Sequence, residues 1–239
     1  MPKLIGLGGV AHSGKDTVAS FINFLANNLN ASYDDYLKNA DSVNNYRIVS
    51  FADPLKRVLS NIYDIHISHF NNTYDKDNLY YLFDKAEVVY VASKEYHEYV
   101  INNNLELSQF IAYHEGKVCI KLRTLMQYFG TNVMRKHMGN TVWIDNTIRI
   151  VNRCNKPCII SDVRFTNESK AIKKAGGVVV KILRNPEINN NHESEIIKFH
   201  ANYTILNNEG LEELFYTTKD LCSLLINNPS TGEFNDVMV

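Results

Sequence analysis

Apolar residues in this chain gather into short continuous runs, separated by stretches in which they recur at helical spacing. The runs that predict strands cover residues 3–7, 46–52, 157–162, 177–184 and 203–208. Continuous apolar strands are typical of a parallel sheet that is buried on both faces. After the first run, Phe21, Ile22 and Leu25 fall on one face of a predicted helix. The pattern predicts an α/β sandwich of three layers, with a mainly parallel five-stranded sheet at its centre.

Two parts of the chain depart from this alternation. Residues 65–118 mix tyrosine, asparagine and alternating apolar positions, which we interpret as an inserted lobe of helices and a hairpin. Residues 121–138 and 140–154 predict helices interrupted at Gly130 and Gly139, and the residues after Asn227 predict a loose tail. The length of 239 residues suits one domain, or one domain with a sizeable insertion, and we expect a single domain that carries the inserted lobe.

Composition narrows the function classes. A formal net charge of −1 argues against a protein that binds nucleic acid mainly through phosphate contacts. No apolar run reaches the ~18 residues of a membrane helix, and the start "MPKLIGLGG" does not resemble a signal peptide. The four cysteines include one close pair, "CNKPC", whose spacing is not C-x-x-C, so we expect reduced thiols in a cytoplasmic protein without a membrane partner.

The stretch "GGVAHSGKDT" lies between the first strand and the first helix. Gly9, Gly14 and Lys15 satisfy the phosphate-binding pattern G-x-x-x-x-G-K, and strand, loop and helix are the context that this pattern requires. Glycines let the backbone approach a polyphosphate, and the N–H groups at a helix start point toward it. The loop therefore predicts a nucleotide site, against the alternative of a glycine-rich turn without a ligand.

The residue after Lys15 departs from the usual pattern. Asp16 stands where a hydroxyl normally binds Mg²⁺, and the hydroxyl of Thr17 arrives one position later. A carboxylate there could bind the ion directly or through water, or take part in acid–base chemistry. We predict a role near the metal for Asp16 and keep Thr17 as the alternative ligand.

A second predicted strand ends in an acid. In "CIISDVR" four apolar or small residues precede Asp162, as in strands whose terminal carboxylate joins the metal shell of P-loop proteins. Arg164 follows at the same sheet edge and could neutralise phosphate charge. The alternative is that Asp162 only caps the next helix.

Further polar residues suggest a second phosphorylated ligand. Asp53 and Lys56 lie in "FADPLKR", where the alternative is a simple helix cap with solvated bases. Arg123, Gln127 and Arg135 are polar positions on otherwise apolar helices. For each one alone the alternative is an ordinary surface position, whereas as a set they favour binding of a phosphate.

In this order the segments resemble a known family. "GVAHSGKDT", "FADPLKR", "LRTLMQYFGT" followed by Trp143, "ISDVR", "HESE" and "ILNNEGLEEL" are similar to the bacteriophage-type deoxynucleoside monophosphate kinases, a branch of the P-loop kinases. Lys-Asp-Thr after the glycine is a variant of that branch. The resemblance covers nearly the whole chain and is thin between residues 65 and 118.

The resemblance implies a role for each segment. It implies an ATP site in the glycine loop, with the adenine against the loop around Asn207, and catalysis by Lys15, Asp16 and Arg164. It implies that the monophosphate lies between "ADPLK", the helix carrying Arg123 and Gln127, and Arg164. The implied ATP contacts are Gly9, His12, Ser13, Gly14, Lys15, Asp16, Thr17 and Asn207, and the implied metal ligands are Asp16, Thr17 and Asp162.

The remaining implied positions concern the acceptor and a lid. The implied acceptor contacts are Asp53, Lys56, Arg123, Gln127, Arg135, Trp143, Asp162 and Arg164; the alternative for Trp143 is a core tryptophan. Residues 185–200 would form a mobile lid, to which Arg184, His192 and Glu195 contribute. The residues 65–118 would form a lobe on the monophosphate side.

The resemblance implies an enzyme that transfers phosphate from ATP to a deoxynucleoside monophosphate with Mg²⁺ as cofactor. It would supply DNA precursors, in the host cytoplasm if the source is a virus. Two alternatives stay open: another small-molecule kinase similar to dephospho-coenzyme A kinase, and a nucleotide-binding module without catalysis. The expected partners are the two small substrates rather than nucleic acid, and the oligomeric state is open, with a homodimer as one option.

Overall fold

A computed structural model describes residues 1–10, 12–83, 85–90, 112–114, 117–184, 199–227 and 237–239 of the chain. The chain divides into two compact units, which are described separately. Unit 1 comprises Met1–Phe51 and Ile144–Val239, and unit 2 comprises Ala52–Trp143.

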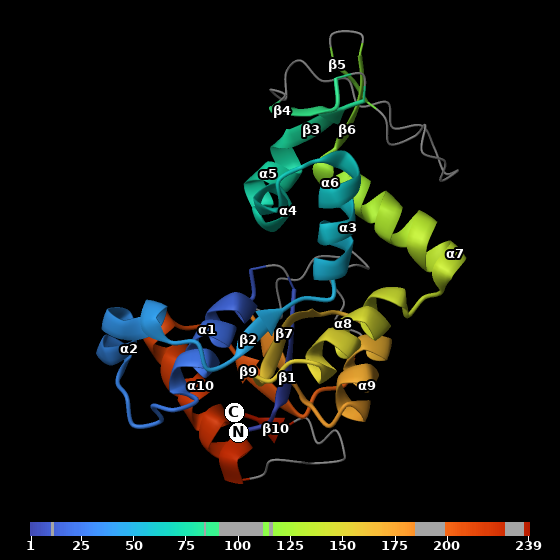
Figure 1. The fold of residues 1–239 in the computed structure, drawn as a ribbon. Helices are drawn as coiled ribbons and strands as arrows, with labels where there is room; N and C mark the ends of the chain where they lie inside the picture. Colours follow the sequence, from blue (N-terminus) through green and yellow to red (C-terminus); the bar gives the residue numbers. More distant parts are fainter. Residues whose placement is uncertain (11, 84, 91–111, 115–116, 185–198, 228–236) are drawn as a thin grey trace. The chain divides into compact units, whose positions relative to one another are not determined.

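Unit 1 is built on a parallel sheet (Figure 1). Among the described residues the sheet has six strands in the order β10-β9-β8-β1-β7-β2. The strands are β1 (Leu4–Gly8), β2 (Arg47–Val49), β7 (Cys158–Val163), β8 (Val178–Leu183), β9 (Tyr203–Leu206) and β10 (Val237–Met238). All their recorded pairings are parallel, with β1 between β7 and β8.

Helices cover both faces of this sheet, as the apolar strands predict. In β8, Val178, Val180 and Ile182 pack in one hydrophobic cluster, whereas Val179 packs in another on the opposite face. Figure 1 shows α1, α2 and α10 on one side of the sheet, and α8 and α9 on the other. These helices are α1 (Lys15–Leu25), α2 (Tyr33–Asn39), α8 (Val142–Asn152), α9 (Thr166–Lys174) and α10 (Leu211–Asn227), and a 3₁₀ turn, Ala40–Ser42, follows α2.

Unit 2 combines helices with an antiparallel sheet whose strand order is β4-β3-β6-β5. Its core contains Phe70, Tyr81, Ile120, Leu125 and Trp143. The strands are β3 (Leu79–Leu82), β4 (Glu87–Tyr90), β5 (Ala112–His114) and β6 (Lys117–Lys121). The helices are α3 (Asp53–Tyr63), α4 (Ile67–Asn71), α5 (Thr73–Asn78), α6 (Leu122–Gln127) and α7 (Lys136–Met138), with a π-helical segment, Tyr128–Arg135, before α7.

The structure corrects three expectations. The sheet of unit 1 has six strands rather than five, because the predicted loose tail ends in β10, which pairs with β9. Gly130 does not interrupt its helix: the chain continues there as a π-helix, and the absent side chain leaves room for Leu55, whose Cδ2 would lie 2.9 Å from a Cβ at this position. Asp53 does not cap α3, since the helix already begins at Asp53 and the cap position is Ala52.

Candidate phosphate-binding site

The glycine loop leads from β1 directly into α1. Two of its residues have positive φ angles, His12 at 61° and Gly14 at 98°, and Gly14 occupies the cap position of α1. Left-handed backbone turns successive N–H groups toward one side, which creates a concave site for an anion. The sequence pattern for a phosphate loop thus coincides with suitable backbone geometry.

A buried asparagine holds the loop in place. The Asn207 amide nitrogen donates to the Ser13 carbonyl oxygen over 2.8 Å, and only 7% of Asn207 is exposed. A Cβ on Gly14 would lie 2.5 Å from the same amide nitrogen, so both the φ angle and this close approach require glycine. The structure therefore places the Asn207 side chain against the loop backbone.

Lys15 forms the centre of a charged cluster. Its Nζ donates to the Val10 carbonyl oxygen over 2.5 Å, which folds the side chain back along the loop. Burial and then the positive charge of Arg164 lower the pKa of Lys15, while the carboxylates of Asp16 and Asp162 act in the opposite direction. The electrostatic coupling brings together four of the residues that the sequence singled out.

The two carboxylates of this cluster differ in their surroundings. Asp16 is exposed on the first turn of α1, and Thr17 beside it is half-buried. Asp162 lies in β7, and its Oδ1 accepts a hydrogen bond from the Phe51 N–H over 2.7 Å. In the part of the chain that the structure describes, no three His, Cys, Asp or Glu side chains form a metal-binding group.

The cluster offers two carboxylates to a metal ion. Mg²⁺ is commonly held by one or two carboxylates together with water and substrate phosphates. Asp16 and Asp162 of the cluster, and the hydroxyl of Thr17 next to Asp16 in α1, are the groups that could hold such an ion.

The segment that carries Arg164 is fixed by a buried acid. Glu168 is 3% exposed, and its Oε2 accepts hydrogen bonds from the N–H groups of Arg164 (2.7 Å) and Phe165 (3.1 Å). These bonds satisfy the start of α9, so Glu168 takes the capping role that was the alternative interpretation of Asp162. The Arg164 side chain remains exposed at the edge where β7 ends.

Ser13 supplies an unusual polar atom in the loop. Its hydroxyl is fully buried, and within the described residues it has no hydrogen-bond partner. A Cβ on Gly9 would lie 2.5 Å from the Ser13 Oγ, so glycine is needed at position 9 as well. A buried hydroxyl without a partner is costly unless a ligand or water satisfies it.

Three of the predicted acceptor residues, Asp53, Lys56 and Arg123, form side-chain ion pairs in unit 2. Asp77 in α5 accepts two hydrogen bonds from the Arg123 guanidinium in α6, one from Nε and one from Nη2 at 2.7 Å. This pairing lowers the pKa of Asp77 and raises the pKa of Arg123. Lys56 pairs with Asp53 over 3.2 Å, one turn apart in α3.

The other predicted acceptor residues are dispersed. Gln127 is exposed at the end of α6, and Arg135 is half-buried at the end of the π-helical segment. Trp143 is 6% exposed, and its Nε1 donates to the Gly130 carbonyl oxygen over 3.1 Å. The structure thus places Trp143 in the core of unit 2, which was the alternative interpretation.

The lid prediction falls largely outside the described residues. His192 and Glu195 lie outside the described residues. Arg184 is described: it is exposed, and its Nη1 donates to the His12 carbonyl oxygen at 3.5 Å. Phe199, near the end of the predicted segment, is buried, and its ring lies where a side chain on Gly8 would project.

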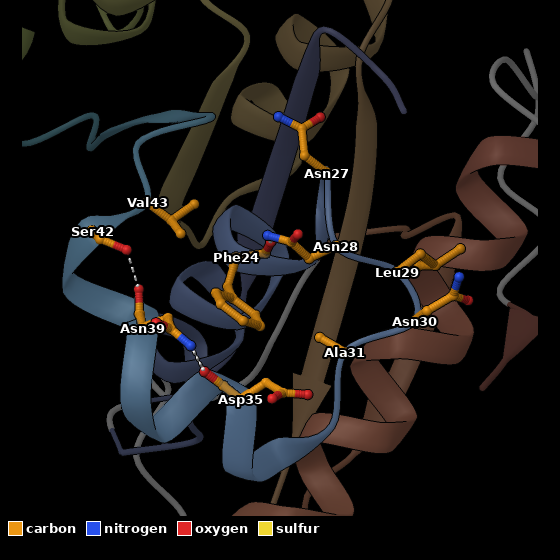
Figure 2. Close-up of a pocket in the computed structure, with 10 residues that line it drawn as sticks. All are labelled: Phe24, Asn27, Asn28, Leu29, Asn30, Ala31, Asp35, Asn39, Ser42 and Val43. Carbon is orange, nitrogen blue, oxygen red and sulfur yellow. Dashed lines mark hydrogen bonds between the residues drawn. The ribbon is translucent and has the colours of Figure 1, made fainter.

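A separate hollow of about 580 Å³ lies beside the opposite end of α1 (Figure 2). Phe24 and a set of asparagines line it, and Asn39 within it bonds the Asp35 carbonyl oxygen over 2.9 Å. The eleven residues of α1 make it about 16 Å long, so this hollow is distinct from the glycine loop at the helix start.

Among the helices that the structure describes, none has both the length and the apolar character needed to cross a membrane.

Sequence reasoning missed two residues of these sites. Glu168 could have been found, because an acid three residues after a helix cap is a known capping pattern. Asp77 carries no such local signal, since it lies 46 residues before Arg123.

Two matches to known proteins bear on the family to which the chain belongs. A family model described as deoxynucleotide monophosphate kinase matches residues 68–218. A relative named putative deoxynucleotide monophosphate kinase, from Acanthamoeba polyphaga mimivirus, is 32% identical over 113 residues, which cover 39% of this chain and 56% of the relative. The chain thus spans little more than half the length of this curated relative. The family match begins after the glycine loop, so the loop geometry is a separate observation.

Proposed function

Since the chain belongs to the deoxynucleotide monophosphate kinase family, we propose that it transfers the γ-phosphoryl group of ATP to a deoxynucleoside monophosphate. The products are ADP and the deoxynucleoside diphosphate. The observation that carries the proposal is the glycine loop with Lys15 at the start of α1, which lies outside the matched range and has the backbone geometry of an anion site.

The loop and its cluster bind the donor. The N–H groups after Gly9 and the start of α1 bind the ATP phosphates, and the buried hydroxyl of Ser13 gains a partner there. Lys15 exchanges its bond to the Val10 carbonyl for a phosphate oxygen. Arg164 neutralises charge on the phosphoryl group as it moves, which is where such a charge lowers the barrier most.

Asp16, Asp162 and Thr17 hold Mg²⁺ in this proposal. When bound, the ion offsets negative charge on the ATP phosphates. The acceptor needs no strong base, because its attacking phosphate oxygen is already anionic. Positioning and charge neutralisation therefore supply most of the rate enhancement.

In unit 2, Arg123 and Lys56 bind the acceptor phosphate. Asp77 keeps the Arg123 guanidinium in a fixed orientation, which suits bidentate recognition of a phosphate. We also propose that residues 65–118 contribute to the monophosphate side, and that residues 185–200, most of which lie outside the described residues, act as a lid that keeps water from the phosphoryl group.

The test is ADP release from ATP and Mg²⁺ with each ribonucleoside and deoxynucleoside monophosphate, with dephospho-coenzyme A included in the panel. Turnover with one or more deoxynucleoside monophosphates, and none in the Lys15→Met variant, supports the proposal. Turnover confined to dephospho-coenzyme A would reassign the acceptor. ATP binding without turnover of any acceptor would make the chain a nucleotide-binding module.

A further inference from the structure

A cluster of two thiols and a guanidinium lies at the amino end of the sheet in unit 1. Cys154 follows α8, Cys158 is the first residue of β7, and Arg47 is the first residue of β2. In the parallel sheet Arg47 pairs in register with Cys158, and its N–H donates to the Pro157 carbonyl oxygen over 2.8 Å. Strand pairing thus fixes the three residues in one corner.

The corner surrounds the Cys154 sulfur with hydrogen-bond donors. The Lys156 N–H bonds to this sulfur, the Arg47 Nη1 lies 4.0 Å from it, and the Cys158 side chain is in contact with it. These bonds lower the pKa of Cys154, whose side chain is half-buried and therefore reachable by small reagents. A thiolate stabilised by a neighbouring cation and by N–H groups is the reactive form of cysteine.

Cys158 has the opposite character. It is 1% exposed, and burial raises its pKa to about 11. Its thiol donates a hydrogen bond to the Lys156 carbonyl oxygen over 3.5 Å, and its side chain is in contact with Cys154. A protonated, shielded thiol in contact with a reactive one is suited to the second step of an oxidation rather than the first.

We propose that Cys154 reacts with peroxides and that Cys158 then closes on it to form an intramolecular disulfide. In the first step the Cys154 thiolate attacks one peroxide oxygen: an S–O bond forms, the O–O bond breaks, and the departing hydroxide takes a proton to become water. In the second step the Cys158 sulfur attacks Cys154: the S–S bond forms, the S–O bond breaks, and the hydroxide leaves with the Cys158 proton as water. Hydrogen peroxide is reduced to two waters, and two thiols become one disulfide.

This site is independent of the kinase chemistry proposed above. Cys158 is level with Leu4 at the start of β1, whereas the glycine loop follows Gly8 at its end. At the usual rise of a strand, the two ends are about 13 Å apart. The reaction can therefore be tested on the purified full chain without reference to its turnover.

The chain is convenient for mass spectrometry. Trypsin cuts after Arg153 and Arg164 but not between Lys156 and Pro157, so both cysteines fall in one peptide, residues 154–164. After peroxide treatment and alkylation, the dithiol form of this peptide carries two alkyl groups. The disulfide form carries none, and its mass is that of the unalkylated dithiol less two hydrogen atoms. Cys119 and Cys222 are internal controls, because both are fully buried thiols in other peptides.

Three variants separate the roles. Cys158→Ala should stop at a Cys154 sulfenic acid that dimedone traps, and Cys154→Ser should remove both the adduct and the disulfide. Arg47→Met should slow alkylation of Cys154 by about two- to fivefold, since it removes the cation beside the sulfur. If Cys158→Ala fails to fold, the half-exposed Cys154 variant and the wild-type peptide still decide the question.

The expected result is a disulfide in peptide 154–164 at peroxide concentrations that leave Cys119 and Cys222 as thiols, with the dithiol restored by dithiothreitol. The proposal is overturned if Cys154 reacts no faster than the two buried controls. It is equally overturned if Cys154 passes to the sulfinic acid without a disulfide in the wild-type chain.

Discussion

The two units arrange their candidate phosphate-binding groups in different ways. In unit 1 the backbone does most of the positioning: the left-handed residues of the loop, the buried Asn207 and the buried Glu168 fix N–H groups and carbonyls. In unit 2 the candidate groups are ends of long side chains held in ion pairs, above all Arg123 with Asp77. Under the proposed function, an ATP site positioned mainly by backbone tolerates few substitutions, whereas an acceptor site built from ion pairs can change its specificity when one partner of a pair is replaced.

The largest effect is expected from removing the positive charge of Lys15 at the end of the glycine loop. Lys15→Met should lower kcat on the order of 10³-fold, because the positioned cation acts on charge that develops in the transition state. The measurement is ADP release with a saturating monophosphate, alongside a thermal melt. Lys174→Met, an exposed position on α9, is the matched control. Near-native turnover in Lys15→Met would remove the donor site from the loop.

The next effect separates Asp16 from Thr17. Asp16→Ala should reduce kcat about 10²-fold and raise the Mg²⁺ concentration needed for half-maximal rate, since the carboxylate occupies the sequence position at which a hydroxyl normally binds the ion. Thr17→Val keeps the shape of the side chain and should cost less. A Mg²⁺ titration of both variants decides the matter: if Thr17→Val is the more damaging change, the hydroxyl is the metal ligand.

The ion pair of unit 2 should have a smaller and more selective effect. Asp77→Asn leaves Arg123 in place without its anchoring carboxylate, so the KM for the monophosphate should rise about tenfold, in line with the loss of a charged hydrogen bond. The KM for ATP and the melting temperature should change little, because both side chains are more than 40% exposed. Asp34→Asn on α2 is the control. A rise in the ATP KM instead would contradict the division of labour between the units.

The contrast between backbone positioning in unit 1 and side-chain pairing in unit 2 also explains which features could be predicted from the sequence. The strands, the helices that cover them and the phosphate loop follow from local patterns: apolar runs, helical spacing, and glycines at fixed intervals. Asp77 could not be linked to Arg123, because their contact depends on how α5 and α6 pack and leaves no short-range pattern. The sixth strand was missed because Val237–Met238 is too short for an apolar period and depends on β9 for its pairing.

Asn207 was predicted from the sequence as a site residue, but its contact with the Ser13 carbonyl oxygen could be seen only in the structure. Asn207→Ala leaves the buried Ser13 carbonyl without its donor, which should cost about 1–3 kcal/mol of stability. It should raise the KM for ATP several-fold by loosening the loop. If the side chain acts through the loop, the KM for GTP rises by the same factor. A change in the ATP to GTP preference would instead show direct contact with the base.

The smallest effect concerns the titration of Lys15, and it tests whether the cluster of unit 1 acts as one electrostatic group. Burial and Arg164 lower the pKa of Lys15 below 10.5, whereas Asp16 raises it. Because the folded-state pKa is lowered, the charged lysine opposes folding at neutral pH, and this cost fades as pH rises through the folded-state pKa toward 10.5. Arg164→Ala should therefore raise the pKa, and Asp16→Asn should lower it further. Carbon-13 NMR of the lysine side chains, with Lys15 assigned from the Lys15→Met spectrum, measures both shifts in the free protein.

Asp34→Asn should leave the Lys15 titration unchanged, because Asp34 is exposed on α2 and is not among the residues that act on Lys15. Shifts of the same sign in Arg164→Ala and Asp16→Asn would mean that the substitutions act through burial of Lys15 rather than through charge. Opposite shifts are expected, since a neighbouring cation and a neighbouring anion bias the protonation of a lysine in opposite directions. That outcome would show that unit 1 adds a tuned side-chain charge to a site otherwise positioned mainly by backbone, which is how it differs from the ion pairs of unit 2.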